Sequence, residues 1–418
     1  MLMRFRAENF RAIKDEQELS LVASAFSEHE ESLVRVPQYD LELLRVAGAY
    51  GANASGKSTL VEAIGFMQAA VRDSQTRWEP QAGVRRVPFA FDPACADAPS
   101  TFAVDLLLDG VRYEYGFVAD SLRVREEWLF AWPKGRRQEW FTRDADRDEE
   151  FAFSRLLSGE NRAIGALTRP NSLFLSAAAQ NNHEMLSPVH QWFAQQLLVV
   201  GDWTRGALAM LVSQRCRDAA YRENVFQLLK TADLGISGLE LTEDEGGPTM
   251  SRLFGAVAGL FGDGNLRDIR LLHRTGEGGE VALPFSDESA GTRALFGLAG
   301  AIVDVLSSGG TLVVDELDRS LHPHLSTHIV RTFNDPVANP RNAQLVFNTH
   351  DTNLLDAGIL RRDQVWFTEK GGDGATHLFP LTDFRARKYE NLERGYLQGR
   401  YGAVPSLGPL APPRGAGS

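Results

Sequence analysis

The chain has 418 residues, of which 43% are hydrophobic and 24% are charged, a composition typical of a globular protein with a sizeable core. Its formal net charge of −11 at pH 7 gives no global electrostatic footprint for nucleic acid, so such binding would need a local basic patch. With two cysteines, no apolar signal-peptide core and no run of about 18 apolar residues, we expect a cytoplasmic protein without disulfides or a membrane span.

The first elements form a strand, a glycine-rich turn and a helix. Residues 1–22 alternate in places between polar and apolar side chains and predict a short β-hairpin around Asn9-Phe10-Arg11. Residues 43–50 are mostly apolar and predict a buried strand that ends at a glycine. Apolar residues then recur at helical spacing at Leu60, Ile64, Met67 and Val71, which predicts an amphipathic helix.

The middle of the chain changes from β-rich to helical. Residues 84–155 predict strands, with a turn at Asp109-Gly110 and a second hairpin near Pro133-Lys134-Gly135. Residues 160–232 are interpreted as mostly helical, as a lid or arm inserted into the core. Residues 243–280 are weakly patterned and predict loop and edge strand.

Regular patterning returns from residue 285 onward. A polar turn precedes a helix that contains Leu295, Leu298, Ile302 and Val305, and a strand follows at Thr311–Val314. A further strand at Leu345–Thr349 completes an alternation of strand, helix and strand, which implies parallel pairing. The tail after Pro405 is rich in proline, glycine and serine and is expected to be disordered.

The glycine-rich turn matches the phosphate-binding pattern G-x-x-x-x-G-K-[ST] in full. Its context between a strand and a helix is the one that the pattern requires. Backbone N–H groups of such a turn surround phosphates, and the helix N-terminus adds favourable partial charge. We expect Lys57 to reach the β- and γ-phosphates of ATP and Ser58 to ligate Mg²⁺. The predicted nucleotide contacts are Gly51, Ala52, Asn53, Ala54, Ser55, Gly56, Lys57, Ser58 and Thr59.

An apolar strand that ends in two carboxylates provides the second part of the predicted site. Leu312-Val313-Val314 is followed directly by Asp315 and Glu316. In a phosphate-loop enzyme the first carboxylate holds Mg²⁺, so Asp315 is the predicted metal ligand beside Ser58. Glu316 is then placed to polarise the attacking water as a general base.

A small turn just before the second helix resembles the signature motif of ABC ATPases in its SMC-like form. It reads Ser289-Ala-Gly291-Thr292-Arg293, and a serine–glycine turn at a helix N-terminus can bind phosphate. Where the transporter form has a second glycine and a glutamine, this chain has Thr292 and Arg293. The resemblance implies that Ser289, Gly291, Thr292 and Arg293 contact nucleotide.

Three more segments are similar to ABC motifs. His350, after the last core strand, resembles the switch histidine and is a candidate catalytic residue. Ser320-Leu-His-Pro323 resembles the loop that crosses the dimer interface, and Asn9-Phe10-Arg11 resembles the first strand of SMC and RecF-like ATPases, where Arg11 would touch nucleotide. The glutamine loop has no assigned position, since neither Gln68 nor Gln81 is suitably placed.

From about Met1 to Pro405 the chain resembles bacterial stand-alone ABC ATPases, most distinctively in the segment 396–405, YLQGRYGAVP. Members of this family look like the ATPase half of abortive-infection and overcoming-lysogenization-defect (OLD) phage-defence systems. The resemblance implies an α/β P-loop ATPase head with a β-rich N-terminal lobe and an inserted helical arm. It also implies hydrolysis of ATP with Mg²⁺, an ATP-sandwiched dimer or higher oligomer, and a separate nuclease-like or Toprim-like effector.

The expected organisation has four parts. Residues 1–155 hold the phosphate loop and the β-rich lobe, 156–242 form the helical arm, 243–405 complete the ATPase head, and 406–418 form the disordered tail. Because only 68 residues follow His350, a further catalytic domain of common size does not fit there, and a nucleic-acid-cutting site is expected on another chain.

Two alternative functions stay open. A RecF-like DNA-repair ATPase would bind nucleic acid, and the best basic segment for this is Trp132–Arg137, near Trp140, although a solvated hairpin turn explains it equally well. A small-molecule kinase on the same phosphate loop would need an acceptor site and has no use for Ser289–Arg293 or His350.

Overall fold

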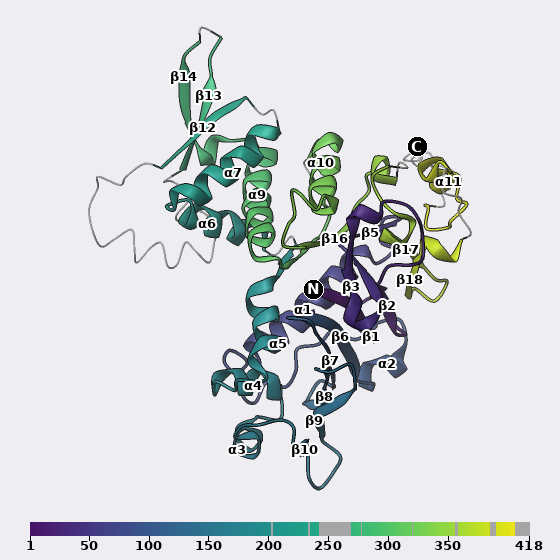
Figure 1. Cartoon of the computed structure of the whole chain (residues 1–418). Helices are drawn as coiled ribbons and strands as arrows, with labels where there is room; N and C mark the ends of the chain where they lie inside the picture. The colour runs from purple at the N-terminus through teal and green to yellow at the C-terminus, as the bar shows by residue number, and fades with distance from the viewer. Residues whose placement is uncertain are drawn as a thin grey trace, which may run out of the picture.

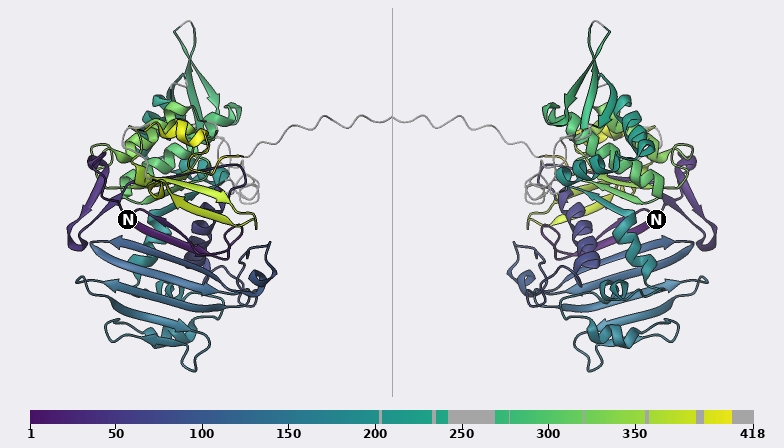
Figure 2. Two further views of the ribbon diagram at one scale, coloured as in Figure 1. Left: turned by 90° about the vertical axis from the view of Figure 1, so that its right-hand side faces the viewer. Right: turned by 90° about the vertical axis from the view of Figure 1, so that its left-hand side faces the viewer.

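The computed structural model describes residues 1–201, 204–232, 235–241, 269–276, 278–319, 321–355, 358–384 and 390–405. The predicted disordered tail, and most of the segment predicted as loop and edge strand, lie outside these residues. The fold contains a central sheet, an antiparallel lobe at one end and a small projecting sheet at the other (Figures 1 and 2).

The central sheet has six strands in the order β11-β15-β16-β5-β17-β18. Figure 1 labels four of them, β16, β5, β17 and β18. Neighbours from β11 to β17 pair in parallel, and only β18 is antiparallel to its neighbour. The bounds are β11 (Leu197–Val200), β15 (Thr311–Val314), β16 (Gln344–Asn348), β5 (Val46–Gly51), β17 (Val365–Lys370) and β18 (Thr376–Pro380). Since the carboxyl ends of parallel strands meet at one edge, the segments after β5, β15 and β16 converge there.

Helix α1 (Lys57–Asp73) begins inside the phosphate-binding pattern and is buried between two sheets. Its apolar side chains pack with Ala47 and Ala49 of β5 on one side and with residues of the antiparallel lobe, such as Phe102, on the other. The opposite face of the central sheet, including Val46 and Tyr50, packs against helices of the C-terminal part. These helices are α9 (Ala290–Ser308), α10 (Pro323–Asn334) and α11 (Leu392–Leu397).

The antiparallel lobe is a seven-stranded sheet in the order β10-β9-β8-β7-β6-β1-β2, which confirms the predicted β-rich lobe. Asp109 and Gly110 form the predicted turn between β6 and β7, and both have positive φ, at 49° and 77°, as a two-residue hairpin loop requires. The bounds are β1 (Leu2–Glu8), β2 (Gln17–Ser20), β6 (Ser100–Leu108), β7 (Val111–Ala119), β8 (Val124–Trp132), β9 (Gln138–Asp144) and β10 (Phe151–Phe153). A separate hairpin pairs β3 (Leu33–Val36) with β4 (Leu41–Leu44).

The segment predicted as mostly helical, residues 160–232, also contains a strand at Leu197–Val200. These residues form β11, which pairs with β15 at the edge of the central sheet, so this part of the segment belongs to the core. A run of four apolar residues has no periodicity that separates strand from helix. The helices of the segment are α3 (Asn161–Leu167), α4 (Phe174–Gln180), α5 (Ser187–Gln191), α6 (Arg205–Arg215) and α7 (Ala219–Thr231), and α2 (Pro93–Asp97) lies earlier in the chain.

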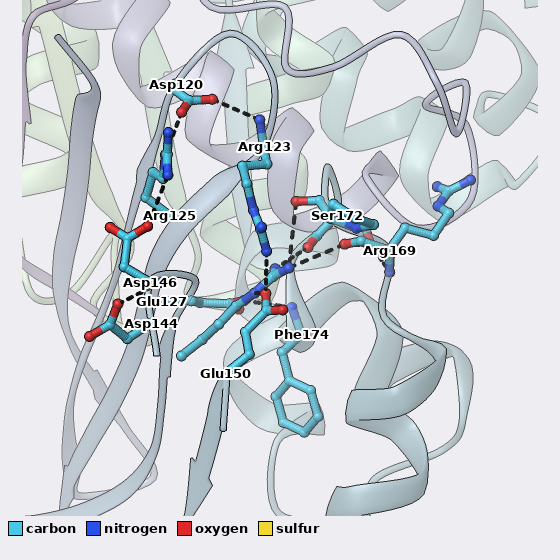
Figure 3. Close-up of polar contacts among 12 residues, drawn as sticks. Asp120, Arg123, Arg125, Glu127, Asp144, Asp146, Glu150, Arg169, Ser172 and Phe174 are labelled. Carbon is cyan, nitrogen blue, oxygen red and sulfur yellow. Dashed lines mark hydrogen bonds and ion pairs between the residues drawn. The ribbon is translucent and has the colours of Figure 1, made fainter. Parts of the chain in front are cut away.

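A buried arginine joins the antiparallel lobe to the loop before α4, and Figure 3 shows this cluster around Glu150, Ser172 and Phe174. The Arg143 side chain is 1% exposed and pairs through Nε with Glu150 at 2.6 Å. Its Nη1 donates to the Ser172 carbonyl at 2.7 Å. Glu127 of β8 accepts from the backbone N–H of Phe174 at 2.6 Å and so caps the first turn of α4.

A three-stranded sheet, β12-β13-β14, projects beyond α7 and α9 (Figures 1 and 2). Its strands are β12 (Ile236–Leu241), β13 (Ile269–Arg274) and β14 (Glu280–Pro284). Among the described helices, α9 alone is long and apolar enough to cross a membrane, and 61% of its apolar stretch is buried inside the fold.

Candidate functional site

The phosphate loop follows β5, and two of its carbonyls accept hydrogen bonds from its own lysine, Lys57. Lys57 Nζ donates to the carbonyls of Gly51 and Ala52 at 2.8 and 2.9 Å. The next residue, Ser58, lies in the first turn of α1. The loop therefore places an ammonium group, a hydroxyl and a helix N-terminus at one point, a combination suited to a polyphosphate and its metal ion.

Burial lowers the pKa of the Lys57 ammonium group. Loss of water around the ammonium lowers the pKa of Lys57 to about 8, although the nearby carboxylates of Glu316, Asp318 and Asp315 act in the opposite direction. Those three carboxylates belong to the segment after β15. The acidic strand end and the phosphate-loop lysine, about 260 residues apart in the chain, therefore lie within electrostatic reach of one another.

The β17–β18 hairpin supports the phosphate loop from behind. Thr376 Oγ1 donates to the Ser55 carbonyl at 2.9 Å, and the hydroxyls of Ser55 and Thr368 share a hydrogen bond of 2.6 Å. Gly56 has φ of +104°, and a Cβ at this position would come within 2.0 Å of Thr376 Oγ1. The glycine is thus required both by backbone conformation and by the closeness of the hairpin.

Asn348, at the end of β16, joins the two carboxylate residues. Its Nδ2 donates to Asp315 Oδ1 at 2.5 Å, and its Oδ1 accepts the Glu316 N–H at 2.7 Å. Asp315 is buried, whereas 39% of the Glu316 side chain is exposed. Glu316 also pairs with Arg319 at 3.5 Å. The buried carboxylate is suited to a metal ion and the accessible one to a water molecule.

Asp318 connects the same segment to the candidate switch histidine. Its Oδ1 accepts the Thr349 hydroxyl at 2.6 Å and the His350 N–H at 3.2 Å. His350 itself is an exposed residue. The loops after β15 and β16 are thus joined by two side-chain links, one through Asn348 and one through Asp318, and His350 lies at the same sheet edge as Glu316.

The signature-like turn caps the long helix α9. Ser289 Oγ accepts the Thr292 N–H at 3.0 Å, and Arg293 Nη1 donates to the Ser286 and Glu288 carbonyls at 2.9 and 3.1 Å. The structure describes all residues of this turn and of the phosphate loop at 51–58. No hydrogen bond or ion pair joins these two segments within the chain. The contact of Arg293 with nucleotide stays a prediction.

Arg11 lies at the mouth of a small recess beside α1. Its φ is 52°, and its Nε pairs with Glu62 Oε2 of α1 at 3.1 Å. Phe10, by contrast, is buried against Phe66 and Phe102, and Asn9 holds the loop before β6 through its side-chain amide. The recess measures about 230 Å³ and is lined by Phe10, Arg11, Glu62, Gly65, Phe66, Arg85 and Val87.

Several supporting residues were not predicted from the sequence. Asn348, Asp318, Thr368 and Thr376 were all missed, and the one signal available was that Asn348 ends an apolar strand two residues before His350. Gln68 has a structural contact instead of a nucleotide-coupling one, because its Nε2 donates to the Phe193 and Leu197 carbonyls. Gln81 is exposed in the loop after α1.

Of the two tryptophans of the basic segment, Trp132 is half-buried beneath the Arg112 guanidinium and Trp140 is buried. Lys134, Arg136 and Arg137 are exposed, but Trp140 is 5% exposed and packs edge-on against Tyr113. Arg137 itself lies over the Phe130 ring at 3.7 Å from its centroid. Trp140 is therefore not available to stack on a base.

The residues present fit Mg-ATP. The loop carbonyls that bind Lys57 Nζ show that the ammonium already points into the turn where phosphates would lie. Ser58 and the buried Asp315 offer oxygen ligands of the kind that Mg²⁺ prefers.

A protein family and two solved structures are similar to this chain. A search of curated proteins finds no match. Among solved structures, the chain is similar to a crystal structure of the SMC head bound to the C-winged helix domain of ScpA, with 14% identity, a TM-score of 0.43 and coverage of 90% of this chain and 96% of that one. It is also similar to the SMC head domain from Thermotoga maritima, with 14% identity, a TM-score of 0.38 and coverage of 91% and 98%. The family described as "AAA domain, putative AbiEii toxin, Type IV TA system" matches residues 48–356, and the chain belongs to this family of AAA ATPase domains.

Proposed function

We propose that this chain is an ATP-hydrolysing switch of the ABC type, in which bound ATP holds two copies together and hydrolysis releases them. The observation that carries the proposal is the joining of Asp315 and Glu316 by Asn348 beside the phosphate-loop lysine. A site built only to bind nucleotide has no need for an accessible carboxylate fixed next to the γ-phosphate position.

Each residue then has a separate role. Lys57 would hold the β- and γ-phosphates, and Ser58 and Asp315 would hold Mg²⁺, which neutralises charge on the phosphates when bound. Glu316 would polarise the attacking water, and His350 would lie close to the γ-phosphate. Arg11, which is half-exposed beside Glu62, would contact the nucleotide from the side of the antiparallel lobe.

A second copy would complete the site. Ser289, Gly291, Thr292 and Arg293, which lie at the start of a 19-residue helix, form no hydrogen bond or ion pair with the fully described phosphate loop of their own chain. In the ABC arrangement the corresponding turn of the second copy covers the γ-phosphate, so ATP supplies contacts that only the dimer makes.

The biological role we propose is the ATPase and sensor component of an anti-phage defence system that controls a separate nuclease-like or Toprim-like effector. Support comes from the family description, which names a toxin of a type IV toxin–antitoxin system. The competing DNA-repair function needs a basic, aromatic surface, and with Trp140 buried the candidate segment offers the exposed turn at 134–137 and the half-buried Trp132.

The test is the solution mass of Glu316→Gln with and without Mg-ATP, measured beside ATP hydrolysis by the wild type. Glutamine keeps the size of the side chain and removes the base, so we expect a stable dimer with ATP and hydrolysis reduced at least about a hundredfold. Arg319→Gln, which removes the cation that pairs with the Glu316 carboxylate at 3.5 Å, serves as the control and should still hydrolyse ATP. Wild-type turnover by Glu316→Gln would contradict the assignment and favour the small-molecule kinase.

A further inference from the structure

The projecting β12-β13-β14 sheet is joined to the signature-like turn by a hydrogen bond between two side chains. His273 of β13 lies 2.7 Å from Glu288, measured from Nε2 to Oε1. The Glu288 side chain is 5% exposed, and that of His273 is 25% exposed. Glu288 immediately precedes Ser289, which is the N-cap of α9.

The turn also has contacts within itself and with α9. Ser289 Oγ caps the Thr292 N–H, and Arg293 reaches back to the Glu288 carbonyl. Phe285, before the turn, is buried against Phe296 of α9, with ring centroids 4.9 Å apart. These contacts fix the backbone on the α9 side, and the Glu288 side chain adds a hydrogen bond to β13 beyond the backbone pairing of β14 with β13, which ends at Pro284.

We propose that the His273–Glu288 pair sets the position of the signature-like turn, and that the projecting sheet thereby controls how well one copy covers the ATP of the other. The inference rests on the proposed ATP-sandwiched dimer and adds positioning residues to it. Neither residue touches nucleotide in this assignment, because Glu288 is turned into the protein toward β13.

The chemistry of the pair favours positioning over a general stabilising role. A buried carboxylate is costly unless it is hydrogen-bonded, so Glu288 holds its place only while the imidazole is present. Loss of the imidazole would free the carboxylate to turn toward water. Because Glu288 and Ser289 are adjacent, the N-cap would move with it, while the distant phosphate loop would not.

The experiment measures ATP-dependent self-association and ATP affinity separately, both in the Glu316→Gln background. His273→Phe keeps an aromatic ring on the strand and removes its donor. We expect self-association with Mg-ATP to weaken about tenfold, which is typical of coupling between two sites. The affinity of the dilute protomer for ATP should stay within about twofold, since the phosphate loop is not touched.

Glu288→Ala should give the same loss, and Glu288→Gln should restore near-parental self-association because its amide oxygen can accept the same hydrogen bond. Glu31→Ala is the matched control, since it breaks the chain's exposed His29–Glu31 pair, which lies at 3.3 Å. The rescue by glutamine and the unchanged ATP affinity separate positioning from loss of folding.

A fourth variant, Ser289→Arg, separates failure of this inference from failure of the proposed function. If Ser289→Arg abolishes ATP-dependent association while His273→Phe leaves it within twofold, the positioning role is wrong and the sandwich stands. If Ser289→Arg also associates normally with ATP, the sandwich itself is wrong and the positioning role is lost with it.

Discussion

Asn348 holds the backbone of Glu316 through a 2.7 Å hydrogen bond from the Glu316 N–H to its side-chain oxygen. Glu316 has φ of 53°, a left-handed conformation that costs a non-glycine residue on the order of 1 to 3 kcal/mol. The same amide binds Asp315, so one buried side chain fixes both carboxylate residues. Strained residues of this kind persist only where surrounding contacts hold them, and here those contacts come from the adjacent strand.

Replacement of Asn348 by alanine should therefore reduce catalysis more than ATP binding. Without the amide, Glu316 can relax toward a right-handed conformation and its carboxylate leaves the position next to the γ-phosphate. We expect kcat to fall about 10- to 100-fold, the usual effect of losing a group that orients a catalytic residue. Steady-state hydrolysis and equilibrium ATP binding measure the two effects separately.

Asn353→Ala is the control for this prediction, because Asn353 is an exposed amide in the turn after His350. Its hydrogen bonds are confined to Asp351. Equal losses of activity in Asn348→Ala and Asn353→Ala would mean that the turn, and not the carboxylate pair, limits hydrolysis.

ATP binding should depend on the protonation of Lys57. Burial lowers the pKa of Lys57 to about 8 in the ATP-free protein, and the phosphates of ATP would raise it again. At pH 7 the lysine is already charged and binding needs no added proton at this group. Above pH 8 the neutral form dominates, so ATP binding takes up a proton and affinity falls by up to about tenfold per pH unit.

Calorimetry at pH 8.5 in buffers of different ionisation enthalpy would count that proton, with pH 7 as the reference. Lys57→Met should lose both the strong binding and the proton uptake. Binding heats at pH 8.5 that are independent of the buffer would show that Lys57 stays charged in the ATP-free protein and would contradict the lowered pKa.

Local patterns in the sequence predicted the parts of the site that one segment supplies alone. The phosphate loop and the strand followed by Asp315 and Glu316 could be predicted, because spacing within about ten residues determines them. The parallel pairing of Thr311–Val314 with the strand before His350 could also be predicted, because strand, helix and strand alternate there. The Asp109-Gly110 turn was predicted for the same reason.

The contacts between segments could not be predicted in this way. Thr376 and Ser55 are hydrogen-bonded although 321 positions separate them in the sequence, and Asn348 and Asp315 although 33 positions do. No local pattern therefore encodes either pair. Strand β11 was missed because four apolar residues pack equally well in a helix or a strand until the neighbouring β15 is known. Tertiary packing, which a single sequence does not display, decided each of these cases.

Thr376→Val should weaken ATP binding without removing it. The substitution keeps the shape of the side chain and deletes the hydroxyl that binds the Ser55 carbonyl at 2.9 Å behind the phosphate loop. A hydrogen bond of this kind contributes about 1 kcal/mol, so we expect the ATP dissociation constant to rise about fivefold. Thr332→Val removes a comparable hydroxyl on α10, bonded to the His328 carbonyl, and should leave binding unchanged. Equal affinity in the two variants would show that the hairpin does not support the loop.

Arg143→Lys should destabilise the antiparallel lobe and leave ATP binding largely intact. The guanidinium pairs with Glu150 and donates to the Ser172 carbonyl at once, and a single ammonium group on a shorter reach does not satisfy both. Since the Arg143 side chain is 1% exposed, the Ser172 carbonyl would lose its donor inside the protein, whereas Glu150 is 32% exposed and keeps its pair with Arg123. We therefore expect a loss of about 1 to 3 kcal/mol. The control is Arg147→Lys, because the Arg147–Asp144 pair is 70% exposed on the arginine side and such surface pairs contribute at most about 1 kcal/mol. Thermal unfolding of the ATP-free protein measures both variants, and limited proteolysis locates the change. Matching unfolding midpoints for the two would mean that the other contacts of the loop before α4, such as the Glu127 cap, hold it without Arg143.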